Sequence, residues 1–130
     1  MKVPVNVENP ARLIRLTTDP WMLQSRKQMI KVSLLYPNEA STTFDMEFYE
    51  KLHVPMVRKL LGTALKGVAV DQGMRSAAGT PPPYVVMCHL LFESLDAFQG
   101  AFPPHAEFIM ADIAKYTNSR PIAQISEMRL

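Results

Sequence analysis

Apolar and polar residues alternate along residues 30–36, which predicts the first β-strand. Pro37 and Asn38 are turn residues and end it. One face of the strand carries Ile30, Val32, Leu34 and Tyr36, and the other carries Lys31, Ser33 and Leu35.

The next apolar pattern has a helical period and predicts a helix over residues 43–61. Thr42 or Thr43 can supply its N-cap, and Gly62 can end it in a left-handed conformation. At about 100° per residue the apolar positions form one broad stripe, which we expect to cover a sheet. The stripe consists of Phe44, Phe48, Leu52, Met56 and Leu60.

A proline inside this helical segment marks its candidate chemistry. Pro55 lacks a backbone N–H and its ring crowds the preceding turn, so we expect a kink near residues 51–54. His53 lies at the kink, and Tyr49 shares its flank of the stripe one turn earlier. His53 is therefore a candidate acid or base in a pocket. The alternative is structural, with the ring bonded to a backbone carbonyl such as that of Lys51, left unpaired by the proline.

The remaining patterns complete an order of strand, helix, strand, strand, helix, strand. This order is the split βαβ pattern of a ferredoxin-like α+β fold, whose helices cover one face of an antiparallel sheet. The further expected elements are a weaker strand at 65–73, a loop at 74–83, the strongest strand at 84–92, helical segments from Ser94 and from Pro103 to about Tyr116, and a last strand at 122–130.

Residues 84–92 are apolar on both faces of their predicted strand. Two helices can cover only one of these faces. We therefore expect the other face to pack against the sheet of a second copy, which makes the protein a homodimer.

Length and composition exclude several classes of protein. The 130 residues, 48% apolar and 20% charged, fit one domain; residues 1–28, interrupted by prolines, read as an N-terminal extension and 29–130 as the compact domain. A net charge of +2 is too even for nucleic-acid binding. The single cysteine, Cys88, precludes an intrachain disulfide, and no apolar segment is long enough to span a membrane, so we expect a cytoplasmic protein.

The three histidines do not have the spacing of a metal site, and we expect neither metal nor cofactor. His89 interrupts an apolar strand, where it either lines the pocket or is a satisfied core histidine. His105, in the first turn of a helix, is expected at the surface. No phosphate-binding glycine motif and no nucleophile elbow is present.

Three segments together resemble the EthD family of the dimeric α/β-barrel superfamily. They are MIKVSLLYP at 29–37, the pair Phe48-Tyr49 with HVPMV at 53–57, and Pro83-Tyr84 opening an apolar strand that ends FESLDAF at 92–98. The resemblance covers about residues 29–130.

This resemblance implies a ferredoxin-like protomer, two of which join their sheets into a barrel, with a small-molecule pocket between sheet and helices. The family is named after a protein associated with alkyl ether degradation alongside an oxidising system. Other members of the superfamily include cofactor-independent monooxygenases, lactone isomerases, polyketide-tailoring enzymes and haem proteins, so haem bound by one histidine stays open. The fold does not select among these activities.

We therefore expect a cofactor-independent enzyme, resembling an oxidoreductase or an isomerase or cyclase, that acts by oxidation or proton transfer on an apolar oxygenated organic compound. The alternative is a non-catalytic binding or accessory protein for a separate oxidising system. His53 matches the His-x-Pro position of the family and would be catalytic with Tyr49. The expected substrate-binding residues are Tyr36, Met56, Tyr84, Met87 and His89.

Overall fold

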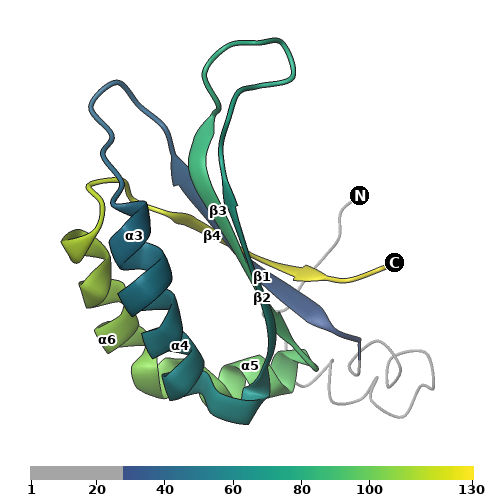
Figure 1. Cartoon of the computed structure of the whole chain (residues 1–130). Coiled ribbons are helices and arrows are strands. Elements are labelled where there is room, and N and C mark those ends of the chain that lie inside the picture. The colour runs from purple at the N-terminus through teal and green to yellow at the C-terminus, as the bar shows by residue number, and fades with distance from the viewer. Residues whose placement is uncertain (1–27) are drawn as a thin grey trace, which may run out of the picture.

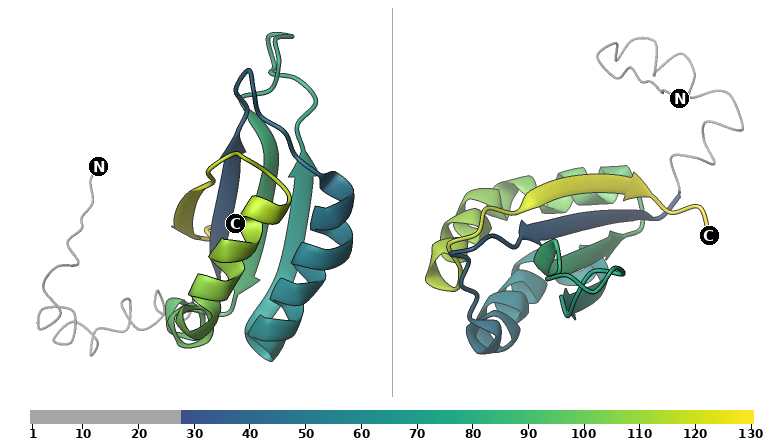
Figure 2. Two further views of the ribbon diagram at one scale, coloured as in Figure 1. Left: turned by 90° about the vertical axis from the view of Figure 1, so that its left-hand side faces the viewer. Right: turned by 90° about the horizontal axis from the view of Figure 1, so that it is seen from above.

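The computed structural model describes residues 28–130, which form a four-stranded antiparallel sheet with its helices on one face (Figures 1 and 2). The predicted N-terminal extension lies outside the described residues, apart from Gln28. The elements are β1 (Ile30–Pro37), α3 (Met46–Phe48), a π-helical segment (Tyr49–His53), α4 (Val54–Leu61), a 3₁₀ turn (Gly62–Ala64), β2 (Leu65–Gln72), β3 (Tyr84–Phe92), α5 (Leu95–Ala101), α6 (Pro103–Asp112), a second 3₁₀ turn (Ile113–Lys115) and β4 (Ile122–Glu127).

The strand order β2-β3-β1-β4 confirms the predicted ferredoxin-like topology. In β1, Val32 lies opposite Leu90 of β3 and Ile125 of β4, so these side chains share the face that the helices cover. The adjacent residue Ser33 lies opposite His89 and points to the other face. We call the helix-covered side the inner face of the sheet and the opposite side the outer face.

The helix that contains Pro55 passes through a π-helical segment where we predicted a kink. The N–H of Val54 donates to the carbonyl of Tyr49, five residues back, and Pro55 falls in the first turn of α4, where a missing N–H costs no hydrogen bond. The N-cap is Asp45, whose carboxylate accepts from the N–H of Phe48, and not Thr42 or Thr43.

The π-helical segment also changes which side of this helix is buried. Leu52, predicted to cover the sheet, is 58% exposed. The buried positions are Tyr49, His53, Val57 and Leu61. A π-helical turn holds more residues than an α-helical turn, so a constant rotation per residue misplaces the stripe. Tyr49 and His53, expected on a flank, therefore face the core.

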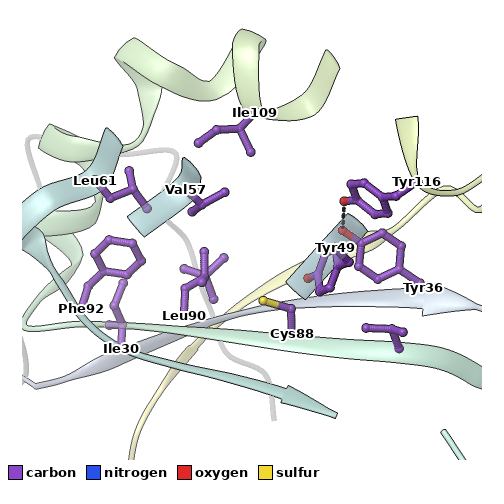
Figure 3. Packing of buried hydrophobic residues seen from close by; sticks show 12 residues of the cluster. Ile30, Tyr36, Tyr49, Val57, Leu61, Cys88, Leu90, Phe92, Ile109 and Tyr116 are labelled. Carbon is purple, nitrogen blue, oxygen red and sulfur yellow. Dashed lines mark hydrogen bonds between the residues drawn. The ribbon is translucent and has the colours of Figure 1, made fainter. Parts of the chain in front are cut away.

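The core lies between the helices and the inner face of the sheet (Figure 3). Four alternate residues of β3 are buried there: Val86, Cys88, Leu90 and Phe92. The residues between them, on the outer face, are only half-buried in this single chain: Val85, Met87, His89 and Leu91. The outer face thus lacks a cover from the part of the chain that the structure describes.

Candidate functional site

An apolar cavity of about 260 Å³ lies between the inner face of the sheet and the helices. Its walls are mostly aliphatic and phenylalanine side chains from β1, β3, β4 and the helices. Besides the thioether of Met110, the lining residues with polar side-chain atoms are Tyr36, Tyr49, His53 and Cys88. Because hydrogen bonds in an apolar cavity do not compete with water, these few groups determine its chemistry.

His53 forms a buried pair with Asp112, the last residue of α6. Its Nδ1 lies 2.8 Å from Oδ2 of Asp112, and the two residues are 5% and 9% exposed. The other carboxylate oxygen of Asp112 accepts from Nζ of Lys115 at 3.2 Å. Both oxygens of the carboxylate therefore have a partner, His53 on the side of the cavity wall and Lys115 on the side of the protein surface.

The protonation states of this pair follow from its surroundings. Burial lowers the pKa of His53 below its ordinary value of 6.5, and the hydrogen bond and charge of Asp112 offset this only in part. Burial disfavours the charged form of Asp112, but its hydrogen bonds from His53 and Lys115 outweigh that and lower its pKa. Near neutral pH the pair is thus a neutral imidazole and a carboxylate. Since a carboxylate only accepts, the proton of His53 is on Nδ1 and Nε2 is unprotonated.

Two tyrosines contact the imidazole, and a third contacts both of them. The hydroxyl of Tyr116 lies 2.6 Å from that of Tyr36 (Figure 3) and 3.4 Å from Nε2 of His53. The ring of Tyr49 stacks on His53 with centroids 5.4 Å apart. Burial raises the pKa of Tyr36 to about 12, and it raises the pKa values of Tyr49 and Tyr116 further. All three hydroxyls therefore carry their protons near neutral pH.

The backbone around Tyr116 holds this tyrosine against the start of the helix. The N–H of Asp45 donates to the carbonyl of Tyr116 at 2.7 Å, and Phe44 forms an isolated β-bridge with Thr117. The hydroxyl of Thr117 in turn donates to the carbonyl of Thr43. These contacts join the segment after α6 to the segment before α3, which brings Tyr116 and His53 together.

Three of the predicted site residues, Tyr36, Tyr49 and His53, line the cavity together. The structural alternative for His53 is not what the structure shows, because its ring nitrogens contact Asp112 and Tyr116 instead of a backbone carbonyl. The catalytic and binding roles of the three residues stay predictions at this point.

The other four predicted substrate-binding residues do not line this cavity. Met56 packs at the edge of the core, and Tyr84 begins β3 opposite Pro37. Met87 and His89 point to the outer face because they alternate with the inward residues of β3. His105 is half-buried in the first turn of α6.

Two residues of the site, Asp112 and Tyr116, were missed from the sequence. They lie 59 and 63 residues beyond His53, so no local motif connects them. A weak signal exists for Asp112, because a negative charge at the C-terminal end of a helix opposes the helix dipole and needs a compensating partner. Lys115 and His53 are those partners.

Within residues 28–130, no group of three or more His, Cys, Asp and Glu side chains is arranged to hold a metal ion. His53 does not fit as a haem ligand, since Nδ1 is bonded to Asp112 and Nε2 is directed at Tyr116 behind the cavity wall. A membrane-spanning candidate is likewise not found among the helices of this part of the chain.

Comparisons with known proteins agree with the fold. No curated protein matches this chain significantly. A solved EthD-like protein from Ralstonia eutropha is 39% identical, with a TM-score of 0.75 over 80% of this chain and 95% of that one. A solved EthD family protein from Bacillus halodurans is 21% identical, with a TM-score of 0.58 over 78% of this chain and 99% of that one. The profile of the EthD domain matches residues 38–120, and the chain belongs to the EthD family.

Proposed function

We propose that this protein is a small-molecule enzyme in which His53 acts as acid or base on an apolar, oxygen-bearing organic compound. The observation that supports it is a neutral imidazole, held by a buried carboxylate, in the wall of an otherwise apolar cavity. A neutral imidazole can accept a proton near neutral pH, and a well-placed acid or base contributes about 10²–10⁴-fold.

The cavity indicates the class of ligand. About 260 Å³ exceeds the cavity of about 150 Å³ that holds a benzene molecule in another protein, so a molecule of two fused rings fits. The residues that line the cavity include no Lys, Arg, Asp or Glu. A charged ligand would lose its hydration without gaining a counter-ion, which favours an uncharged one.

Proton transfer and oxidation share a first step in such a site. Removal of a proton from a carbon or oxygen atom next to an unsaturated system leaves an electron-rich anion. This anion can be reprotonated elsewhere, which isomerises the compound, or can react with dioxygen without a cofactor. Both reaction classes therefore begin with the same proton transfer, in which His53 is the base.

The test uses β-tetralone, an uncharged two-ring ketone with exchangeable hydrogens next to its carbonyl. We expect the protein to accelerate their exchange in deuterated water, followed by NMR, and His53→Gln to lower this rate by about 10²-fold or more. Oxygen uptake in the same solution reports oxidation. Unchanged exchange in His53→Gln would exclude the acid/base role. Binding of β-tetralone without exchange would support the accessory binding protein instead.

We also propose that the outer faces of two copies pack together in a homodimer. The supporting observation is the half-buried apolar row of Val85, Met87 and Leu91 with Leu35 beside it, on a face without helices. Sedimentation should give twice the chain mass of 14.7 kDa for the wild type and a single-chain mass for Leu35→Glu. Leu52→Glu, the same change on the exposed side of the helix, should leave the dimer intact. A wild-type monomer would contradict the dimer.

A further inference from the structure

Tyr116 connects two groups of the cavity wall without belonging to the wall itself. Tyr36 and His53 line the cavity, whereas Tyr116 is 3% exposed and lies behind them. Its hydroxyl is 2.6 Å from the hydroxyl of Tyr36 and 3.4 Å from Nε2 of His53. The second distance is longer than an optimal hydrogen bond, as is common for catalytic contacts before a ligand is bound.

Asp112 determines which nitrogen of His53 can accept a hydrogen bond. Its carboxylate accepts from Nδ1 of His53, so Nε2 can only accept. Either hydroxyl can donate in the 2.6 Å contact between Tyr36 and Tyr116. When Tyr116 donates to Nε2, its oxygen accepts from the hydroxyl of Tyr36. The oxygen of Tyr36, which the hydroxyl of Tyr49 also reaches, faces the cavity and can accept from a donor there.

We propose that Tyr116 is a positioning residue that passes a proton between Tyr36, where the ligand oxygen binds, and His53. This inference rests on the proposed function and specifies its proton path. The O–H bond of the ligand breaks as its proton moves to Tyr36, while the proton of Tyr36 moves to Tyr116 and that of Tyr116 to Nε2. One proton has then passed from ligand to imidazole, no electron has moved, and the ligand oxyanion accepts a hydrogen bond from Tyr36.

The surroundings favour this path over direct contact of the ligand with Nε2. The ring of Tyr116 is packed at centroid distances of 4.9 Å from Tyr49 and 5.2 Å from Phe44, so its hydroxyl is fixed in front of Nε2. High pKa values keep both relay tyrosines neutral except during transfer. The imidazolium that forms is stabilised by the carboxylate of Asp112.

The probe is α-naphthol, an uncharged two-ring phenol that becomes a strong acid when excited by light. It emits as naphtholate only if a proton acceptor is within reach, and as the neutral form otherwise. With the protein in excess, we expect naphtholate emission from the wild type and at least a tenfold lower ratio of naphtholate to naphthol emission in Tyr116→Phe. His53→Gln should show the same loss, and Tyr84→Phe, which changes a tyrosine outside the cavity, should not.

Binding is measured separately with α-methoxynaphthalene, which has no proton to give, and should be within about twofold in all variants. Should Tyr116→Phe fail to fold, Tyr36→Phe removes the cavity-side hydroxyl and should abolish naphtholate emission in its place. Naphtholate emission that persists in Tyr116→Phe but not in His53→Gln would overturn the relay and leave His53 as a direct acceptor. Neutral emission from the wild type also overturns it, and exchange of β-tetralone then decides whether the proposed function stands. Failure of both naphthalene probes to bind would overturn the ligand class.

Discussion

Two histidines on opposite sides of the sheet, His53 from the helix and His89 from β3, show how differently the same residue types behave. On the inner side, His53 is 2.8 Å from Asp112 and both are buried. On the outer face, Nε2 of His89 is 3.8 Å from Asp71, whose side chain is 65% exposed, and Nδ1 is 2.7 Å from Oγ of Ser33. Each histidine has a carboxylate partner, but only the inner pair adjoins the apolar cavity.

The place of His89 follows from its position in β3. Cys88 lines the cavity and His89, its neighbour in the chain, points the other way, because successive residues of a strand alternate between faces. An exposed carboxylate 3.8 Å from a histidine contributes little to the free energy of unfolding. In the core, where water cannot replace a lost partner, removal of one member of a pair is costly. The buried pair therefore has the position that the proposed function requires, whereas the outer histidine lies outside the cavity and is hydrogen-bonded to Ser33.

Removal of the carboxylate should give the largest difference between the two pairs, measured as the free energy of unfolding. Asp112→Ala leaves the buried Nδ1–H of His53 without an acceptor, and we expect a loss of about 2 kcal/mol in the free energy of unfolding. Asp71→Ala, the matched change on the outer face, should cost less than about 0.5 kcal/mol. Urea unfolding measures both. Asp112→Asn keeps an acceptor and should recover part of the loss, and equal costs for the two alanine variants would contradict the comparison.

A bulky side chain should weaken ligand binding when it is placed in the cavity, and not when it is placed on the outer face. Ala123 of β4 lines the cavity and its neighbour Gln124 lies opposite Ser33 on the outer face. Ala123→Phe should weaken binding of α-methoxynaphthalene at least tenfold, or about 1.4 kcal/mol, by occupying its space. Gln124→Phe adds the same ring outside the cavity and should leave the affinity unchanged. A fluorescence titration measures both, and equal losses would place the ligand elsewhere.

The sequence predicted the sheet and its topology because strand periodicity is local. The alternation at 30–36 and the apolar run at 84–92 match β1 and β3. The candidate site was predicted only in part. His53, Tyr49 and Tyr36 were named from a local motif and from strand ends, whereas Asp112 and Tyr116 reach them through tertiary packing across about 60 residues of sequence.

The facing of individual residues was harder to predict than the elements themselves. Leu52 was expected to cover the sheet and is exposed, because the π-helical segment before Pro55 shifts the helical phase. Met87 and His89 were expected at the ligand, and the register of β3 puts them on the outer face. Which side chains of a strand or an irregular helix face the core depends on the elements packed against it. Those elements lie elsewhere in the chain, so the sequence of one segment does not reveal them.

The pH dependence of the free energy of unfolding should show the smallest of these effects, and it should still distinguish His53 from His89. The pKa of His53 is lowered on folding, so the unfolded chain takes up a proton near its ordinary pKa of 6.5 while the folded chain resists. Stability from this group is complete above about pH 6.5 and decreases as the pH falls. Asp112, whose pKa is also lowered, adds a further loss only below its ordinary value of 3.8. Unfolding measured between about pH 7.5 and pH 5 therefore includes the loss from His53 and excludes that from Asp112. His53→Gln should flatten the curve in this interval and His89→Gln should leave the contribution of His53 in place, whereas a flattened curve in His89→Gln alone would reverse the assignment.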